Sequence, residues 1–273
     1  MDIATILGLL VGMGLVGGAI FVQGNAQGTN PLVFVELNSF MIVFGGTLAA
    51  TAIAFPLKEV LRLMTILRAV FKGSKLELGP LVDEVVDMGG VARKGPKELE
   101  DALGNVRNPF LRDGLQMVVD GYSVEEIRDI LGTRVEYREE RESAEASLFK
   151  AMGKFSPAFG IIGTLIGLVY MLKGMGTGGG EDVAAQVGGG MATALITTFY
   201  GALLANLLFL PMAEKLLSQI THKSTMQNMI TEGVCLLQMK KHPLIIREKI
   251  NSFIPPREWK RIEPGAGGGG GGA

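Results

Sequence analysis

Three threonines inside two apolar stretches are the side chains whose type and spacing could do chemistry. Thr164 lies in the segment GTLIG, and Thr197 and Thr198 are adjacent in the segment LITTFYG. Hydroxyl oxygens, together with backbone carbonyls and water, are hard ligands suited to a partly dehydrated alkali cation. A Thr hydroxyl can equally bond the carbonyl one turn back while small neighbours pack two helices together. From spacing alone, packing is the simpler interpretation and a cation site is the alternative.

Ionisable groups are missing from the middle of every apolar stretch. Glu36 is the exception, and it lies close to one end of its stretch. A pump or carrier that moves protons through its own helices normally keeps a buried ionisable group. If this chain conducts an ion, the carboxylate must therefore come from another chain.

Small and special residues around the threonines indicate how two helices could meet. Gly160, Gly163 and Gly167 are spaced to form a packing face. Pro157 is either the start of a helix or a hinge within one, and helix-starting is the simpler interpretation. Asn206 is expected to make an interhelical hydrogen bond.

Four apolar stretches must position these residues: residues 3–22, 32–55, 156–172 and 188–212. A helix needs about 20 apolar residues to cross the hydrocarbon core of a bilayer. Each stretch is close to that length, so the sequence predicts four transmembrane helices. The first stretch has no basic segment before it, which favours a retained helix over a signal peptide.

The basic residues predict the orientation of these helices. Every Lys and Arg except Lys173 lies in residues 57–155 or 213–273, and the two short connections, 23–31 and 174–187, contain none. Cytoplasmic loops carry the excess of Lys and Arg. Both termini are therefore predicted to be cytoplasmic, and the two short loops external.

The hydrophilic segments are predicted to be helical. In the insert the pattern predicts an amphipathic helix over residues 57–71 and others over 81–91, 96–103, 110–119, 124–131 and 133–154, with Gly121 ending one and Ser123 capping the next. In the tail it predicts helices over 214–240 and 244–253. Strand-like alternation is absent, which predicts an all-α membrane protein with a large helical insert between its second and third spans and a helical tail.

This pattern divides the chain into five predicted domains. They are transmembrane helices 1 and 2 (1–56), the cytoplasmic insert (57–155), transmembrane helices 3 and 4 (156–213), the cytoplasmic C-terminal helices (214–264) and a flexible Gly-rich end (265–273).

Composition argues against several functions. The formal net charge of −1 argues against a nucleic-acid partner. The single cysteine, Cys235, and the two distant histidines argue against a metal site, and no cofactor is expected beyond a transported ion. No nucleophile–base pair or phosphate loop is visible, so we do not expect an enzyme.

Several motifs closely resemble the MotA/PomA family of bacterial flagellar stator subunits. PAFGIIGTLIGLV (157–169) resembles the third span of that family, and MATALITTFYG (191–201) with PMA (211–213) resembles the fourth. Further similarities are IVFGGT (42–47), ARK (92–94) and VDG (119–121). The resemblance covers residues 1–255.

The resemblance implies a stator subunit in the bacterial inner membrane. Family members form a homo-oligomeric ring, understood as five copies around two copies of a single-span partner of the MotB/PomB kind that supplies the ion-carrying aspartate. Sodium-type members carry Thr at the positions of Thr164 and Thr198, so sodium is favoured over protons. Glu36 matches an acid near the ion entrance. Pro157 and Pro211 match two prolines thought to couple ion passage to movement of the cytoplasmic domain.

The resemblance also implies where the rotor is contacted. The charged residues that meet a rotor protein of the FliG kind correspond to Arg93 and Lys94, followed by Glu98, Glu100 and Asp101. Because the acidic stretch is offset by one residue from the family pattern, it leaves open which acid makes the contact. Without the resemblance, such a charge cluster is simply a solvated helix face.

Four alternatives stay open. A proton-driven stator would have the same fold. An energiser like ExbB or TolQ shares the core motifs but typically has three spans, against the four predicted here. A small-solute permease is expected to show internal repeats and a polar midplane site, and neither is found. In a non-conducting membrane scaffold the threonines would only pack.

Overall fold

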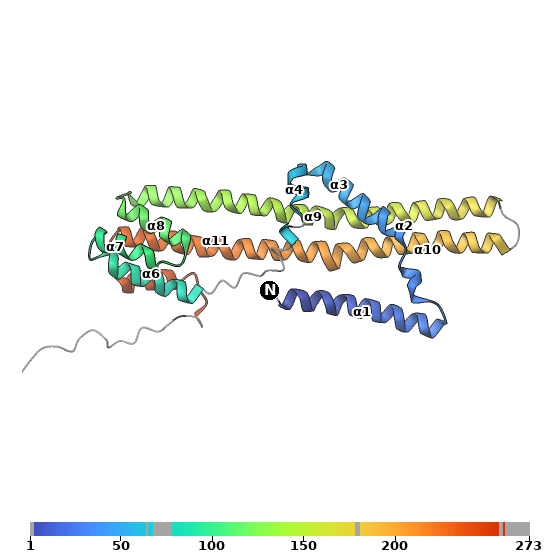
Figure 1. The fold of residues 1–273 in the computed structure, drawn as a ribbon, viewed down its shortest axis with the longest axis horizontal. Coiled ribbons are helices and arrows are strands. Elements are labelled where there is room, and N and C mark those ends of the chain that lie inside the picture. The colour runs from blue at the N-terminus through green and yellow to red at the C-terminus, as the bar shows by residue number, and fades with distance from the viewer. Residues whose placement is uncertain (1–2, 64, 68–77, 178–180, 257–258, 260–273) are drawn as a thin grey trace, which may run out of the picture. The chain divides into compact units, whose positions relative to one another are not determined.

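The computed structural model of the chain describes residues 3–63, 65–67, 78–177, 181–256 and 259, and every regular element within these ranges is a helix (Figure 1). The predicted all-α class is confirmed. Within the described residues, four helices are long and apolar enough to span a membrane: Ile3–Gln27, Pro31–Ala54, Val124–Gly176 and Val183–Gln238. The predicted Gly-rich end and the last residues of the predicted 57–71 helix lie outside the described ranges.

Packing divides the chain into two compact units. Unit 1 comprises Met1–Ser74 and Arg141–Gln219, and unit 2 comprises Lys75–Glu140 and Ile220–Ala273. The two units are groups of residues that pack together, whereas the five predicted domains were divided by hydrophobicity. The two sets of boundaries therefore differ.

The first two spans of unit 1 differ in regularity. Helix α1 is continuous over Ile3–Gln27. The second span is broken into the 3₁₀ turn η1 (Pro31–Phe34), α2 (Leu37–Phe40), the π turn η2 (Met41–Gly45) and α3 (Gly46–Ala54). Between η1 and α2, Val35 and Glu36 leave helical geometry, with Glu36 extended at φ −116° and ψ 114°. The prediction of one continuous helix over residues 32–55 was therefore wrong at its N-terminal end. Helix α4 (Leu57–Leu61) follows this span.

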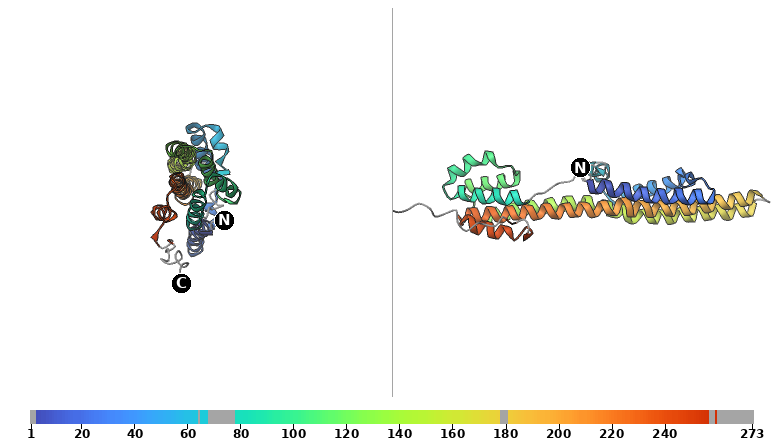
Figure 2. Two further views of the ribbon diagram at one scale, coloured as in Figure 1. Left: turned by 90° about the vertical axis from the view of Figure 1, so that its left-hand side faces the viewer. Right: turned by 90° about the horizontal axis from the view of Figure 1, so that it is seen from below.

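Glycines bring the third and fourth spans into backbone contact. The third span is the second half of α9 (Val124–Thr177), which lies beside α10 (Glu181–Leu203) in Figure 1 and in the right-hand view of Figure 2. A Cβ on Gly160 would lie 3.0 Å from the carbonyl oxygen of Thr197, and one on Gly167 would lie 2.6 Å from that of Gly190. The predicted small-residue packing face is confirmed.

Both prolines lie inside long helices. Pro157 is internal to α9, so the helix-starting interpretation was wrong. Its ring would crowd the carbonyl of residue 153, which belongs to a glycine. Pro211 follows the π turn η4 (Leu204–Phe209), at the start of α11 (Leu210–Gln238). A π turn widens the helix just before Pro211 removes a hydrogen-bond donor, which is a recognised way to absorb a proline.

Unit 2 is a helical domain with its own apolar core. Besides parts of α9 and α11, it contains α6 (Leu78–Ala92), α7 (Pro96–Ala102), η3 (Leu103–Asn105), α8 (Pro109–Val119) and α12 (Pro243–Asn251). With parts of α9 and α11 they bury a cluster that includes Leu111, Leu115, Ile127, Leu131 and Ile246.

Local signals place the helix ends of unit 2 as predicted. Gly121, at φ +81°, ends α8. Ser123 and Glu126 exchange two hydrogen bonds, Ser123 N–H to Glu126 Oε2 at 2.8 Å and Glu126 N–H to Ser123 Oγ at 3.2 Å, which form a capping box at the start of α9. The predicted helices over 124–131 and 133–154 are one helix, because a single Gly132 costs only about 1 kcal/mol in a helix interior.

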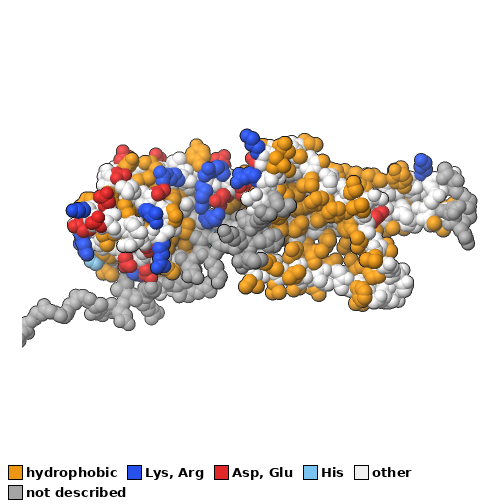
Figure 3. Space-filling model, viewed as in Figure 1, with side chains coloured by type: hydrophobic (Ala, Val, Ile, Leu, Met, Phe, Trp, Pro, Cys, Tyr) orange, Lys and Arg blue, Asp and Glu red, His pale blue; other side chains and the backbone are white. Residues whose placement is uncertain are grey.

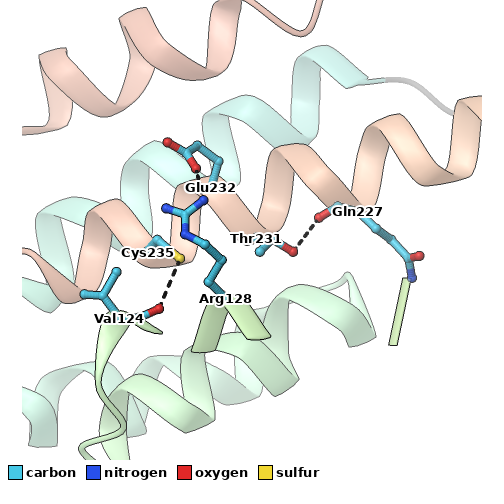
Figure 4. Close-up of polar contacts among 6 residues, drawn as sticks. All are labelled: Val124, Arg128, Gln227, Thr231, Glu232 and Cys235. Atoms are coloured by element: carbon cyan, nitrogen blue, oxygen red, sulfur yellow. Dashed lines mark hydrogen bonds and ion pairs between the residues drawn. The ribbon is translucent and has the colours of Figure 1, made fainter. Parts of the chain in front are cut away.

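Polar contacts join the two longest helices of unit 2 (Figure 4). Arg128 Nη1 lies 2.9 Å from Glu232 Oε2, and one turn away the buried Cys235 Sγ donates a weak bond of 3.9 Å to the Val124 carbonyl. Burial raises the pKa of the Cys235 thiol. This thiol is therefore a packed core side chain.

The surfaces of the two units differ in chemistry. In Figure 3 hydrophobic side chains dominate the visible face of α1, α2 and α3, whereas Lys, Arg, Asp and Glu gather over α6, α7 and α8. Large apolar side chains of unit 1 are strongly exposed, among them Leu10 at 65%, Leu15 at 70% and Ile53 at 88%. Such a surface belongs in lipid or against other protein chains.

Candidate functional site

Thr164 and Thr198 meet across the contact between α9 and α10. Their hydroxyl oxygens lie 2.5 Å apart. Thr164 Oγ1 is also 3.0 Å from the Ala194 carbonyl oxygen and 3.1 Å from that of Gly160, and Thr198 Oγ1 is 3.3 Å from the Ala194 oxygen. Each hydroxyl has one proton for several acceptors, so lone pairs remain on both. Two hydroxyl oxygens and one carbonyl oxygen thus converge on one small region.

The glycines explain why these hydroxyls can come so close. Gly163 lies directly before Thr164, and a Cβ there would be 2.5 Å from Cβ of Thr197. A Cβ on Gly201 would be 3.2 Å from the Cα of Gly160. Because neither position has a side chain, the two helices approach closely enough for the short Thr164–Thr198 contact.

Thr197 differs from its neighbour. It is fully buried, faces Gly163, and directs its hydroxyl to the carbonyls of Thr193 (3.0 Å) and Ala194 (2.9 Å). Its link to the Thr164–Thr198 pair is the shared Ala194 oxygen. Thr198 is exposed. Thr197 therefore stabilises the helix contact, and Thr198 is the member of the pair that solvent or another chain can reach.

Glu36 is tied to α10 by several bonds. Its Oε1 accepts from Thr193 Oγ1 at 2.8 Å and its Oε2 from Ser39 Oγ at 2.5 Å. Its backbone N–H donates to the Tyr200 hydroxyl at 3.2 Å, and that hydroxyl donates to the Phe34 carbonyl at 2.5 Å. The carboxylate therefore lies next to the helix that carries Thr197 and Thr198.

Contacts also connect the two proline regions. A Cβ on Gly201 would lie 3.2 Å from Cα of Pro157, and one on Gly153 would lie 2.5 Å from Leu210 Cδ2. Ser156 Oγ donates to the Gly201 carbonyl at 3.1 Å. Pro157 is thus packed against α10, and the turn before it is packed against the residue that precedes Pro211. Asn206 bonds the Ala202 carbonyl of its own helix at 2.9 Å, so the interhelical bond expected for it was wrong.

The predicted rotor-contact residues lie together in unit 2. Arg93 and Lys94 form the turn after α6, and Glu98, Glu100 and Asp101 belong to α7. All five are exposed. Leu99 between them is only 1% exposed and holds α7 on the core. The structure therefore presents basic and acidic groups on one short helix–turn segment.

Thr193, Tyr200 and Ser39 are polar partners that the sequence reasoning missed. Thr193, Thr197 and Tyr200 are spaced i, i+4 and i+7, which places them on one face of a helix. That spacing was available in the sequence. The break at Glu36, which allows the Tyr200 hydroxyl to bond the backbone of the second span, was not visible in the sequence.

Comparison with known proteins identifies the family. Residues 103–229 match the MotA/TolQ/ExbB proton channel family. Motility protein A of Borreliella burgdorferi (strain ATCC 35210 / DSM 4680 / CIP 102532 / B31) is 35% identical over 269 residues, which cover 98% of this chain and 100% of that protein. The chain belongs to the motility protein A family. Chemotaxis protein PomA of Vibrio alginolyticus is 31% identical over 93% of this chain and 96% of its own length.

Solved structures agree with this membership. A chain of the C. jejuni MotAB structure matches with a TM-score of 0.83 and 27% identity, covering 96% of this chain and 100% of that one. A chain of the flagellar MotAB stator complex from Bacillus subtilis matches with a TM-score of 0.79 and 29% identity, covering 91% and 96%. The family and the four apolar helices together make this motility protein A relative a multi-pass membrane protein.

Proposed function

We propose that this chain is a flagellar stator subunit that forms an ion-conducting complex with a MotB-like partner and converts ion flow into torque on the rotor. Sodium is the favoured ion. The full-length similarity to motility protein A, PomA and the MotAB structures supports the stator role. The close approach of Thr164 and Thr198, 2.5 Å apart on an accessible part of the α9–α10 pair, carries the choice of ion.

The physical argument for sodium concerns water. A sodium ion that enters an apolar layer loses part of its hydration shell and needs oxygen atoms in exchange. The two hydroxyls and the Ala194 carbonyl offer such oxygens, and a partner's aspartate would add the negative charge that the spans of this chain lack in their middle. A proton needs no such ligands, because it travels on a carboxylate.

The remaining residues have complementary roles in this proposal. Glu36 stands near the external entrance and attracts the cation. Pro157 and Pro211, whose regions are packed together, transmit a change at the threonines toward the cytoplasmic helices. Arg93, Lys94 and the acids of α7 meet opposite charges on a rotor protein of the FliG kind. The excess of Lys and Arg in the insert and tail supports a cytoplasmic location for both termini of a bacterial inner-membrane protein.

The surface of unit 1 supports oligomerisation. Its exposed apolar side chains are spread over the described spans, and further copies together with lipid would bury them. We propose a ring of copies, pentameric as the family resemblance implies, around the partner's helices.

The test is the swimming speed of a strain that depends on this chain and its partner, measured against sodium concentration at constant ionic strength. Thr164→Val and Thr198→Val keep the side-chain shape and remove the hydroxyl. Each is expected to weaken the response to sodium while the complex still assembles. Thr225→Val in α11 is the matched control, because the Thr225 hydroxyl is exposed and donates to the Thr221 carbonyl one turn back at 2.9 Å.

The outcomes separate the candidate functions. A wild-type speed that follows proton-motive force and ignores sodium indicates a proton-driven stator. Unchanged sodium dependence in both valine variants shows that the hydroxyls only pack the helices. Failure to restore motility at all, despite membrane insertion and partner binding, contradicts the stator role and favours an ExbB- or TolQ-like energiser or a scaffold.

A further inference from the structure

The break in the second span leaves backbone groups without helical partners. Val35 and Glu36 are not helical, so the Phe34 carbonyl and the Glu36 N–H lie outside the ladders of η1 and α2. In the apolar layer of a membrane such groups are costly unless another part of the protein bonds them. A specific partner is therefore required at this position.

One side chain satisfies both groups. The Tyr200 hydroxyl donates to the Phe34 carbonyl at 2.5 Å and accepts from the Glu36 N–H at 3.2 Å. A phenol can donate and accept at once, whereas Phe can do neither and a Thr hydroxyl on α10 would be too short to reach as far. The ring is held by an edge contact with Phe40, with centroids 6.2 Å apart, and by Phe199 at 5.9 Å.

The same break determines where Glu36 points. Its backbone is fixed by Tyr200, while its two carboxylate oxygens accept from Thr193 and Ser39. Tyr200 and Thr193 both belong to α10, seven residues apart, so one helix face holds the backbone and the side chain of Glu36. A loose backbone at this point would let the carboxylate turn away.

We infer that Tyr200 is a positioning residue that, by bridging the Phe34 carbonyl and the Glu36 N–H, fixes the direction in which Glu36 presents its carboxylate to a cation. This inference rests on the proposed role of Glu36 at the ion entrance. Tyr200 itself does not touch the ion. It acts through the backbone of Glu36.

The test uses the full stator complex with its partner and the variant Tyr200→Phe, which keeps the ring and removes the hydroxyl. Tyr170→Phe, at a tyrosine on α9 that is 66% exposed, is the matched control. The sodium concentration at half-maximal speed should rise about fivefold or more in Tyr200→Phe, because the variant loses both hydrogen bonds of the hydroxyl, with little change in maximal speed. Tyr170→Phe should match the wild type.

Two further measurements separate positioning from simple stability. Hydrogen exchange of the purified complex should be faster in residues 34–40 of Tyr200→Phe and unchanged in α6. In a Glu36→Gln background, Tyr200→Phe should add no further shift in the half-maximal sodium concentration, because both changes act on one group. Thr193→Val, which removes a carboxylate partner instead of the backbone bridge, should shift the sodium response in the same direction.

The results that overturn the inference differ from those that overturn the proposed function. If Glu36→Gln shifts the sodium response and Tyr200→Phe does not, or if the two shifts simply add, the positioning role is wrong while the role of Glu36 stands. If Glu36→Gln itself changes nothing, its role at the entrance fails and the inference fails with its premise. If wild-type speed ignores sodium, the same series is measured against external pH, with the same criteria.

Discussion

Replacing Gly163 by alanine should separate the two helices that carry the threonine pair. The added Cβ would lie 2.5 Å from Cβ and Cγ2 of Thr197, and ordinary contact begins near 3.4 Å, so the helices must move apart by about 0.9 Å there. Such overpacking costs about 1–3 kcal/mol. Alanine gains back about 1 kcal/mol of helix propensity over glycine. The net expected loss of stability is therefore up to about 2 kcal/mol.

Gly188→Ala in α10 is the control, because nothing lies within 4 Å of a Cβ at that position. It keeps the propensity gain and lacks the clash, so the difference between the two variants isolates the packing cost. Thermal unfolding of the purified complex measures stability, and swimming speed against sodium measures function. A shift of about 0.9 Å would carry the Thr164–Thr198 contact beyond the usual hydroxyl range of about 2.5–3.0 Å. Equal stability and equal sodium dependence in both variants would refute the view that Gly163 sets this contact.

Three other changes test separate parts of the structure. A cysteine at Gly28 should react with an impermeant maleimide from outside, and a cysteine at Lys97 should not. The native Cys235 is buried and its pKa is raised, so it should stay unlabelled in the folded protein. The reverse labelling pattern would show that the topology is inverted. Backbone and side-chain hydrogen bonds from Ser123 lower the pKa of Glu126 below its ordinary 4.5, so this stabilising contribution to unit 2 is present above about pH 4.5 and is lost as the pH falls through the lowered pKa. Glu126→Gln, which removes the titrating carboxylate, should reduce the acid sensitivity of unfolding followed by circular dichroism. The double variant Arg93→Glu/Lys94→Glu should reduce swimming speed more than Arg93→Gln/Lys94→Gln. Neutralisation removes exposed ion pairs that contribute only about 0–1 kcal/mol each, whereas charge reversal adds repulsion. Normal motility after the double reversal would place the rotor contact elsewhere.

Hydrophobic length and charge were enough to predict the class of this fold. The four apolar helices, the caps at Gly121 and Ser123, and the glycine face of α9 follow from local residue types, because membrane thickness, φ preferences and small-residue packing act at short range. The division of α9 into two separate helices was wrong, because a single Gly132 was given more weight as a breaker than its small cost justifies.

The break at Glu36 could not be predicted from the second span alone. Residues 32–55 read as a uniform apolar helix, and the groups that make the break tolerable come from α10, more than 150 residues later in the chain. The same holds for the threonine pair. Its residues were identified as candidates, but their 2.5 Å separation depends on Gly163 and Thr197 fitting together across two helices.

The two polar clusters of unit 1 share helix α10, and this links the proposed entrance at Glu36 to the proposed ion site. Thr193 bonds Glu36 through its hydroxyl, and its carbonyl oxygen accepts from the Thr197 hydroxyl at 3.0 Å. Thr197 also bonds the Ala194 oxygen that Thr164 and Thr198 approach. A cation passing Glu36 would therefore meet oxygens that one rigid helix has already placed in order. Because a π turn and Pro211 follow on the same chain segment, a local change in α10 has a defined place where the helix can yield.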